Sequence, residues 1–225
     1  MESLLKITDL VVRHGRRTAL DRITLQVDSN AGIIGVFGPN GAGKTTLFNA
    51  VAGQLPISSG TIAIKDNTMP TYLPDRNVIY NFLSIKESIK LFSEYFQDFS
   101  AEIAGQVLET VKLDSNLKVS QLSKGMKEQL NLGLMLSRRS SLYLFDEPLA
   151  AVDPLTRDTL LNLIETFRPK QAAVLISTHL IYGLEKLFNE CMVIYNGRLL
   201  LHQPCQELAA KGGLENKVKE VLSNA

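Results

Sequence analysis

The sequence predicts an α/β fold in which a parallel β-sheet core carries an antiparallel β edge and a helical insertion. Three observations point to this fold. Short β-type runs alternate with turns over the first 35 residues. From about residue 74 to residue 139, apolar residues recur three and four positions apart, which is a helical period. Beyond that point apolar strands and amphipathic helices alternate, as they do around a parallel sheet.

The amino-terminal segments predict the antiparallel edge and the first core strand. LLKITDLVVRH (4–14) and ALDRITLQVD (19–28) have strand character, and GTIAIKD (60–66) adds a third short strand. GIIGVF (32–37) is short, apolar and rich in β-branched residues, which favours a buried strand. This strand leads through a glycine-rich loop into KTTLFNAVAGQL (44–55), for which we predict a helix.

We predict a single domain over residues 1–225, with a helical subdomain inserted at about 76–140. Its helical segments are IKESIKLFSEYF (85–96), AEIAGQVLETVKL (101–113) and MKEQLNLGLMLSRR (126–139). Strand SLYLFDEP (141–148), helix DPLTRDTLLNLIETFR (153–168) and strand QAAVLIST (171–178) then restore the α/β alternation. A helix over 180–188, a hairpin around Asn196–Gly197 and a helical tail from Cys205 complete the prediction.

The composition of the chain argues against nucleic-acid binding, a cysteine metal site and a membrane span. The chain has 24 Lys and Arg against 23 Asp and Glu, so no basic excess predicts nucleic-acid binding. The cluster of Arg13, Arg16 and Arg17 is interpreted as a solvated hairpin. Cys191 and Cys205 lack a partner at metal-ligand spacing, which favours reduced thiols in a cytosolic protein. We expect no signal peptide, and no apolar run approaches the ~18 residues of a membrane span, so a membrane would be reached through a partner.

Residues 38–45, GPNGAGKT, match the phosphate-loop pattern G-x-x-x-x-G-K-[ST] at every defined position. Glycines let successive backbone N–H groups face phosphate oxygens, aided by the positive end of the following helix. Lys44 is expected to reach the β- and γ-phosphates, and the Thr45 hydroxyl to ligate Mg²⁺. A glycine-rich turn that binds nothing is the alternative. The predicted core is that of a P-loop NTPase of the RecA-like type, with nucleotide contacts from Gly38, Pro39, Asn40, Gly41, Ala42, Gly43, Lys44, Thr45 and Thr46.

The strand SLYLFDEP ends in two carboxylates beside the predicted loop. Four largely apolar residues put Asp146 at the carboxyl end of a buried strand, where it can hold Mg²⁺ through a water molecule. Glu147 follows it and can polarise an attacking water as a general base. The alternative is an Asp-Glu pair that ends a strand at the surface.

The segment SQLSKGMKEQ (120–129) indicates which nucleotide enzyme this is. The chain here resembles the ATP-binding cassette (ABC) ATPases, and the resemblance runs from about residue 4 to about residue 205. Ser123 and Gly125 match the family signature Leu-Ser-Gly-Gly-Gln, whereas Lys124 and Met126 depart from it. The resemblance implies that this segment contacts the γ-phosphate of ATP bound to another subunit. The alternative is a helix for which Ser123 is only the N-cap.

Other motifs follow in the family's order. Asp153 in AAVDP occupies the acidic position of the loop that touches the opposite subunit, and His179 in STH that of the switch histidine at the γ-phosphate. His14 stands where the family usually has a tyrosine that stacks on adenine, a contact that imidazole makes with less area. For His179 the alternative is a structural histidine at a strand end, and for His14 an exposed histidine on a turn.

One further departure concerns the metal. The family has a glutamine that reaches Mg²⁺ after the β-subdomain, and TYLPDRN (71–77) puts Asp75 there. Aspartate is shorter by one methylene and charged, so it either ligates Mg²⁺ more strongly or fails to reach it. Phe82, Leu83 and Ile85 are candidates for the groove that receives a membrane partner, or else they belong to the core.

The resemblance implies the ATP-binding subunit of a bacterial ABC transporter, with ATP and Mg²⁺ as cofactors. Two such subunits, as a homodimer or as a heterodimer with a second ABC ATPase, would sandwich two ATP molecules and drive separately encoded transmembrane permease subunits. Lys44, Glu147 and His179 would carry the hydrolysis. The protein would be cytoplasmic, held at the inner face of the membrane by those permease subunits, and would bind no nucleic acid.

The departures from the family motifs indicate to which branch of the family the chain belongs. LSKGM (122–126) and YLPD (72–75) resemble export systems for drugs, peptides or envelope components. Importer ATPases more often keep the glutamine and carry a regulatory domain, for which the residues after Cys205 leave no room. A soluble ABC ATPase that acts on ribosomes or DNA is a second hypothesis, although such chains usually hold two cassettes or long coiled coils. A P-loop kinase or GTPase would leave LSKGM and STH unexplained.

Overall fold

The computed structural model describes residues 2–150, 152–179, 184, 186–209 and 213–224. The chain divides into two compact units. The strand unit contains Met1–Tyr72, Ser141–Glu147 and Lys170–Ala225, and the helical unit contains Leu73–Ser140 and Pro148–Pro169. The single domain with a helical subdomain at about 76–140 stays a prediction.

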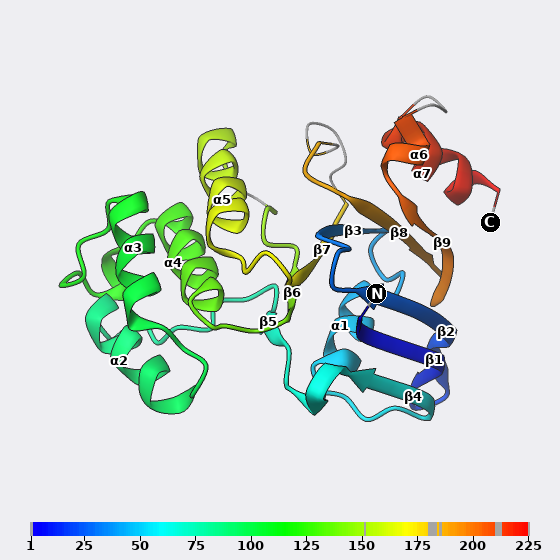
Figure 1. Ribbon diagram of the computed structural model, residues 1–225, viewed down its shortest axis with the longest axis horizontal. Helices are drawn as coiled ribbons and strands as arrows, with labels where there is room; N and C mark the ends of the chain where they lie inside the picture. Colours follow the sequence, from blue (N-terminus) through cyan, green and yellow to red (C-terminus); the bar gives the residue numbers. More distant parts are fainter. Residues whose placement is uncertain (1, 151, 180–183, 185, 210–212, 225) are drawn as a thin grey trace. The chain divides into compact units, whose positions relative to one another are not determined.

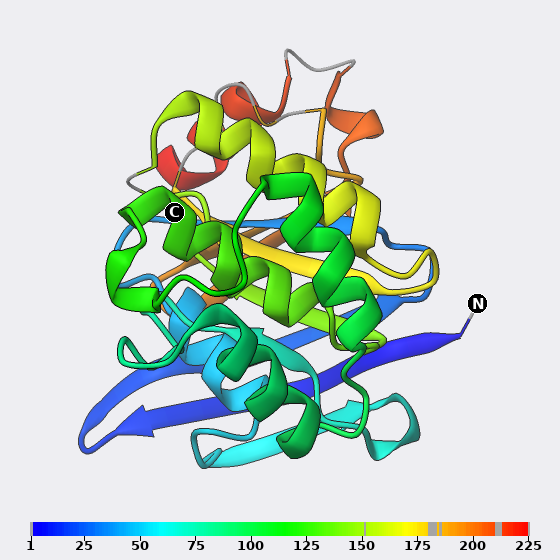
Figure 2. The ribbon, with the colours of Figure 1, turned by 90° about the vertical axis from the view of Figure 1, so that its left-hand side faces the viewer.

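The strand unit contains an antiparallel sheet of three strands. Its order is β2-β1-β4, with β1 over Ser3–His14, β2 over Arg17–Asp28 and β4 over Ser59–Ile64. β1 pairs with both neighbours in antiparallel register, and Figure 2 shows β1 and β2 as two long adjacent strands. Their apolar side chains join one core with α1 and the second sheet. The predicted antiparallel edge is therefore confirmed.

The second sheet has the order β5-β6-β7-β3-β8-β9 (Figure 1). Its strands are β5 (Thr71–Leu73), β6 (Leu142–Asp146), β7 (Ala173–Thr178), β3 (Ile33–Phe37), β8 (Glu190–Tyr195) and β9 (Arg198–Pro204). β3 runs parallel to β7 and β8, β6 runs parallel to β7, and only the pairing of β8 with β9 is antiparallel among those described. Every residue of β3, β6 and β7 is buried, which explains their continuous apolar runs. The α/β class predicted from the sequence is confirmed.

Parallel strands end at the same edge of their sheet, and this edge carries the predicted motifs. The phosphate loop follows β3 and leads into α1 (Lys44–Val51). Glu147 follows β6 directly, and His179 follows β7. β3 and β6 both pair with β7, so three segments far apart in the sequence meet at one edge.

The helical unit contains α2 (Ile85–Tyr95), α3 (Ala101–Val111), α4 (Lys124–Leu136) and α5 (Pro154–Phe167). Ser84 and Glu87 form a capping box that fixes the start of α2, and Ser100 caps α3 through the N–H of Ile103. Short 3₁₀ turns lie at Val119–Gln121 in this unit and at Lys65–Asn67 in the strand unit. The helical periods predicted from the sequence therefore correspond to helices.

The last elements belong to the strand unit. The hairpin of β8 and β9 around Asn196–Gly197 is present, and the tail forms α6 (Gln206–Ala209) and α7 (Leu214–Ser223). Residues 180–183 and 185 of the helix predicted at 180–188 lie outside the described residues, and the described residues 184 and 186–188 form no helix, so the prediction is wrong for these. Within the part of the chain that the structure describes, every helix is too short or too polar to cross a bilayer.

Candidate functional site

The phosphate loop of residues 38–43 is shaped by close contacts on its back. Gly38 has a φ of 153°, and a Cβ there would lie 2.2 Å from the carbonyl oxygen of Ile194. Gly43 has a φ of 115°, and a Cβ there would lie 2.8 Å from Leu20 Cδ2. Both glycines are therefore required by the backbone conformation and by the protein's own packing.

Lys44 begins α1 and its side chain is only 7% exposed. Its Nζ donates to the carbonyl oxygens of Gly38 at 2.8 Å and of Pro39 at 3.3 Å, and lies 3.7 Å from Oε1 of Glu147. These oxygens offset the cost of burying the ammonium group. The ammonium thus lies inside the loop, beside the first N–H groups of α1. Thr45 is exposed and Thr46 is half-buried at the same helix terminus.

Asp146 is 1% exposed at the end of β6. Its Oδ1 accepts a short hydrogen bond of 2.5 Å from the hydroxyl of Ser177 on β7. Its Oδ2 is buried and has no hydrogen-bond partner among the described residues. A buried carboxylate oxygen without a donor is costly unless a ligand or an ion satisfies it.

Glu147 lies between the lysine and the histidine. One carboxylate oxygen is 3.7 Å from Lys44 Nζ, and the other is 3.0 Å from Nδ1 of His179. The Glu147 side chain is 13% exposed and that of His179 is 50% exposed. A carboxylate held between an ammonium group and an imidazole, at the mouth of a phosphate loop, is positioned to orient and deprotonate a water molecule.

The oxygen atoms at this edge fit Mg²⁺. The buried Oδ2 of Asp146 and the exposed hydroxyl of Thr45 are hard ligands of the kind that Mg²⁺ prefers. Within the described residues, no three His, Cys, Asp or Glu side chains form a metal cluster. Such a donor set suits a metal that is shared with substrate phosphates.

His14 lies at the carboxyl end of β1, opposite Arg17 in the hairpin with β2. Its side chain is exposed. Both the stacking role and the exposed-turn alternative predicted for it are compatible with this position.

In the helical unit, Ser123 and Asp153 begin neighbouring helices. Ser123 caps α4, because its hydroxyl accepts a hydrogen bond from the N–H of Met126 at 3.2 Å. Ser123 is thus an N-cap, as the alternative interpretation predicts. Asp153 caps α5 through the N–H (3.0 Å) and hydroxyl (2.6 Å) of Thr156, and these bonds lower the pKa of Asp153. A Cβ at Gly125 would lie 2.9 Å from Oγ1 of the same threonine. Thr156 therefore connects the two predicted contact segments.

Asp75 is exposed in the segment that follows β5 and belongs to the helical unit. Burial raises the pKa of Glu128 on α4, and the charge of Asp75 raises it further against the effect of Lys124. Among the predicted groove residues, Phe82 is 71% exposed and stacks on Tyr80.

Ile85 is a correction to the predicted groove. It is 0% exposed at the start of α2, so it belongs to the core of the helical unit and cannot line an exposed groove. The alternative prediction, that these apolar residues belong to the core, is therefore confirmed for Ile85.

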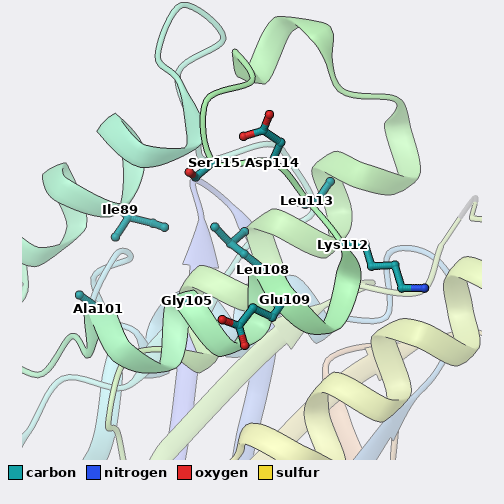
Figure 3. Close-up of a pocket in the computed structure, with 9 residues that line it drawn as sticks. All are labelled: Ile89, Ala101, Gly105, Leu108, Glu109, Lys112, Leu113, Asp114 and Ser115. Atoms are coloured by element: carbon teal, nitrogen blue, oxygen red, sulfur yellow. The ribbon is translucent and has the colours of Figure 1, made fainter.

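A cavity of about 600 Å³ lies in the helical unit (Figure 3). It is open, and Ile89, Gly105 and Leu108 contribute to an apolar wall. Charged groups at its rim come from Glu109, Lys112 and Asp114. None of its lining residues is a predicted site residue.

Sequence reasoning missed the role of Ser177. Its hydroxyl donates to Asp146 and accepts the N–H of Glu147 at 2.9 Å, so it orients both carboxylate residues. Ser177 is fully buried two residues before His179, but its bonds to Asp146 and Glu147 join residues far apart in the sequence and leave no signal in it.

Comparisons with known proteins identify relatives of this arrangement. The family model described as "ABC transporter" matches residues 20–150. The chain is 26% identical to the ABC-type transporter ATP-binding protein EcsA of Bacillus subtilis, covering 98% of this chain and 95% of the relative. It is 29% identical to the Nod factor export ATP-binding protein I of Cupriavidus metallidurans (92% and 73%). It is 27% identical to the lantibiotic transport ATP-binding protein SrtF of Streptococcus pyogenes (89% and 90%).

Solved structures share the fold. An ATP-binding subunit of an ABC transporter superposes with a TM-score of 0.84 at 22% identity, covering 97% of this chain and 99% of the other. CbiO1 of Clostridium perfringens, part of the ABC transporter complex CbiONQ, superposes with a TM-score of 0.77 at 20% identity, covering 100% and 97%.

Proposed function

Because the chain belongs to the ABC transporter family, whose model matches residues 20–150, we propose that it powers export through separate membrane subunits by ATP-driven dimerisation. It is an ATP-binding subunit of an ABC transporter and an ATPase coupled to transport. The observation that carries the proposed catalytic site is the Glu147 carboxylate, held 3.0 Å from His179 Nδ1 and 3.7 Å from Lys44 Nζ.

The chemistry is phosphoryl transfer from ATP to water. The N–H groups of the loop and the ammonium of Lys44 bind the β- and γ-phosphates and stabilise the charge that develops on them. Glu147 accepts a proton from the attacking water, and His179 orients Glu147 and reaches the γ-phosphate. Thr45 and Asp146 would hold Mg²⁺, which neutralises phosphate charge when bound. Asp75 is proposed as a further contact to it.

The proposed working unit is a pair of ATP-binding subunits. Each ATP is bound by the phosphate loop of one subunit, and His14 of that subunit stacks on the adenine. The other subunit contacts the same ATP through Ser123, Gly125 and Asp153. A second copy of this chain is the simplest partner, and a different ABC ATPase is the alternative. Support comes from the exposed positions of Ser123 and Asp153 at the starts of α4 and α5.

Export is proposed over import. It is supported by relatives whose names state Nod factor export and lantibiotic transport, by Asp75 in place of the glutamine that importers more often keep, and by the departures at Lys124 and Met126 from the family signature. Separate transmembrane subunits are supported by the similarity to CbiO1, which is part of the ABC transporter complex CbiONQ. The chain would then lie at the cytoplasmic face of the membrane, and its membrane partner would carry the substrate site.

Substitution of Lys44 tests the nucleotide site. Lys44→Ala is expected to weaken MgATP binding by at least about tenfold, because it removes a charge-assisted contact to the phosphates. Isothermal titration calorimetry measures this, with Lys86→Ala as the control that removes an exposed lysine from the first turn of α2. An affinity equal to that of the unchanged chain would remove the phosphate-loop assignment.

A further inference from the structure

The turn between β8 and β9 lies against the phosphate loop. Tyr195 pairs with Arg198, so Asn196 and Gly197 form a two-residue turn, with positive φ angles of 47° and 76°. Two positive φ angles characterise a type I′ turn, for which Asn-Gly is a preferred pair. The peptide groups of this turn therefore point in fixed directions.

Both polar backbone groups of Gly197 are used outside the hairpin. Its N–H donates to the carbonyl oxygen of Ala42 in the phosphate loop at 2.9 Å. Its carbonyl oxygen accepts from the N–H of Asp21 on β2 at 2.8 Å. A Cβ at Gly197 would lie 2.5 Å from the carbonyl oxygen of Ala19, so this position admits no side chain without a shift. The turn thus joins β2 to the back of the loop.

The bond to Ala42 sets the direction of the next N–H group. The described residues contain no cis peptide bond, and in a trans peptide the C=O and the following N–H point in opposite directions. Because Gly197 holds the Ala42 carbonyl at the back of the loop, the N–H of Gly43 is directed toward the opposite side. That is the side on which a phosphate loop binds phosphate oxygens.

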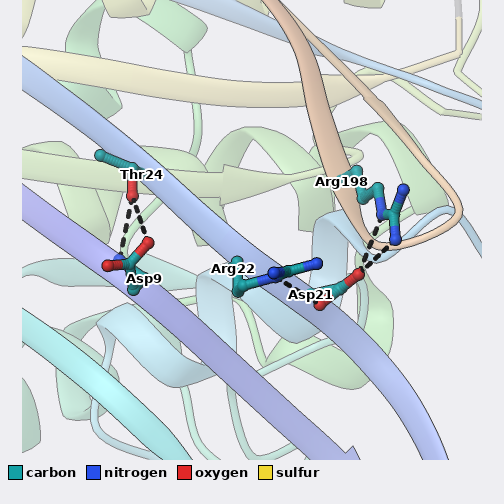
Figure 4. A network of polar contacts seen from close by, with 5 residues as sticks. All are labelled: Asp9, Asp21, Arg22, Thr24 and Arg198. Atoms are coloured by element: carbon teal, nitrogen blue, oxygen red, sulfur yellow. Dashed lines mark hydrogen bonds and ion pairs between the residues drawn. The ribbon is translucent and has the colours of Figure 1, made fainter.

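An ion pair holds the turn in place. Nε and Nη2 of Arg198, the first residue of β9, donate to Oδ2 of Asp21 at 2.9 Å and 2.7 Å. Arg22 contacts the other carboxylate oxygen at 3.3 Å and comes from β2 itself (Figure 4). The hydrogen bonds from Arg198 lower the pKa of Asp21, so its carboxylate is ionised at neutral pH. Of the two arginine contacts to Asp21, that of Arg198 is the one that links β2 to the turn, beside the backbone bond from the N–H of Asp21 to Gly197.

We propose that Gly197, held in place by the Asp21–Arg198 ion pair, is a positioning residue for nucleotide binding. It contacts no phosphate, but it fixes the peptide that presents the Gly43 N–H to the nucleotide. This inference rests on the proposed nucleotide site. It gives the β8–β9 hairpin a function in ATP affinity that its place at the end of the sheet does not suggest.

Arg198→Ala tests the proposal, with Arg22→Ala as a matched control. Both variants remove one arginine that contacts Asp21, but only the first removes the side-chain contact between β2 and the turn. We expect Arg198→Ala to weaken MgATP binding about two- to fivefold, the range that an exposed ion pair supports. Its melting temperature without nucleotide should stay unchanged, while the rise in melting temperature caused by MgATP becomes smaller. Amide hydrogen exchange at Gly197 should become faster, and Arg22→Ala should show none of these changes.

Charge reversal supplies a rescue. The double variant Asp21→Arg with Arg198→Asp restores an ion pair of opposite orientation and should recover most of the affinity lost in Arg198→Ala. Equal MgATP affinities for Arg198→Ala, Arg22→Ala and the unchanged chain would overturn the positioning role. If Lys44→Ala still abolished binding in that case, the nucleotide site would stand and only this inference would fall. A chain that bound no MgATP at all would overturn both.

Discussion

At the scale of single residues, Glu147 combines an unusual backbone with the central contacts of the site. Its φ of 49° lies in the left-handed region, which costs free energy for a residue with a Cβ. Its N–H is held by the hydroxyl and the carbonyl oxygen of Ser177, at 2.9 Å and 3.2 Å. These bonds maintain the backbone that aims the carboxylate between Lys44 and His179.

Glu147→Gln separates binding from catalysis. The amide keeps the size of the side chain but cannot take a proton from water, so hydrolysis should fall by about 10²–10⁴-fold while MgATP binding is retained. Phosphate release and calorimetry measure the two properties. Glu165→Gln, at an exposed position on α5, is the control and should hydrolyse ATP at the normal rate. A loss of less than tenfold in Glu147→Gln would mean that another group activates the water.

Contiguous motifs made much of this site predictable. The phosphate loop, Asp146 and Glu147 each follow an apolar strand, so the sequence itself places them at strand ends. The roles of Ser177 and Gly197 were not predictable, because their partners lie far away in the sequence. Hydrogen bonds between residues on different strands leave no periodic signal in a single sequence.

At the scale of elements, the hydrophobic period predicted α2 and α3 but did not predict the shortest strand, β5. The segments predicted at 85–96 and 101–113 contain α2 and α3, since each has a clear apolar face and an N-terminal serine cap. β5 was not predicted, because three residues are too few to show an alternation. Its position is fixed by pairing with β6, which is a tertiary contact.

Two glycines of neighbouring helices test how α3 and α4 contact each other. A Cβ at Gly133 on α4 would lie 2.4 Å from Val107 Cγ1, whereas one at Gly105 on α3 meets nothing within 4 Å. Gly133→Ala should therefore lower the free energy of unfolding by about 1 kcal/mol, since overpacking outweighs the gain in helix propensity. Gly105→Ala should raise it by about 0.5–1 kcal/mol. Urea denaturation measures both, and a stabilised Gly133→Ala would contradict this contact.

At the scale of the whole molecule, the structure groups α5 with the helical unit, as part of Pro148–Pro169. The sequence alternation places this helix between two core strands, and period alone does not tell which neighbours a helix contacts. Within the helical unit, Thr156 of α5 connects Asp153 with Gly125 of α4. Both segments proposed to contact a second subunit therefore belong to one compact body.

We propose that two copies of this chain close around MgATP. Light scattering on purified Glu147→Gln, with and without MgATP, tests it most directly because slow hydrolysis keeps the nucleotide bound. We predict a shift from the mass of one chain, 24.9 kDa, to that of two when MgATP is added. Lys44→Ala in the same background should remain monomeric. A Glu147→Gln chain that binds MgATP and keeps the mass of a monomer would contradict the homodimer.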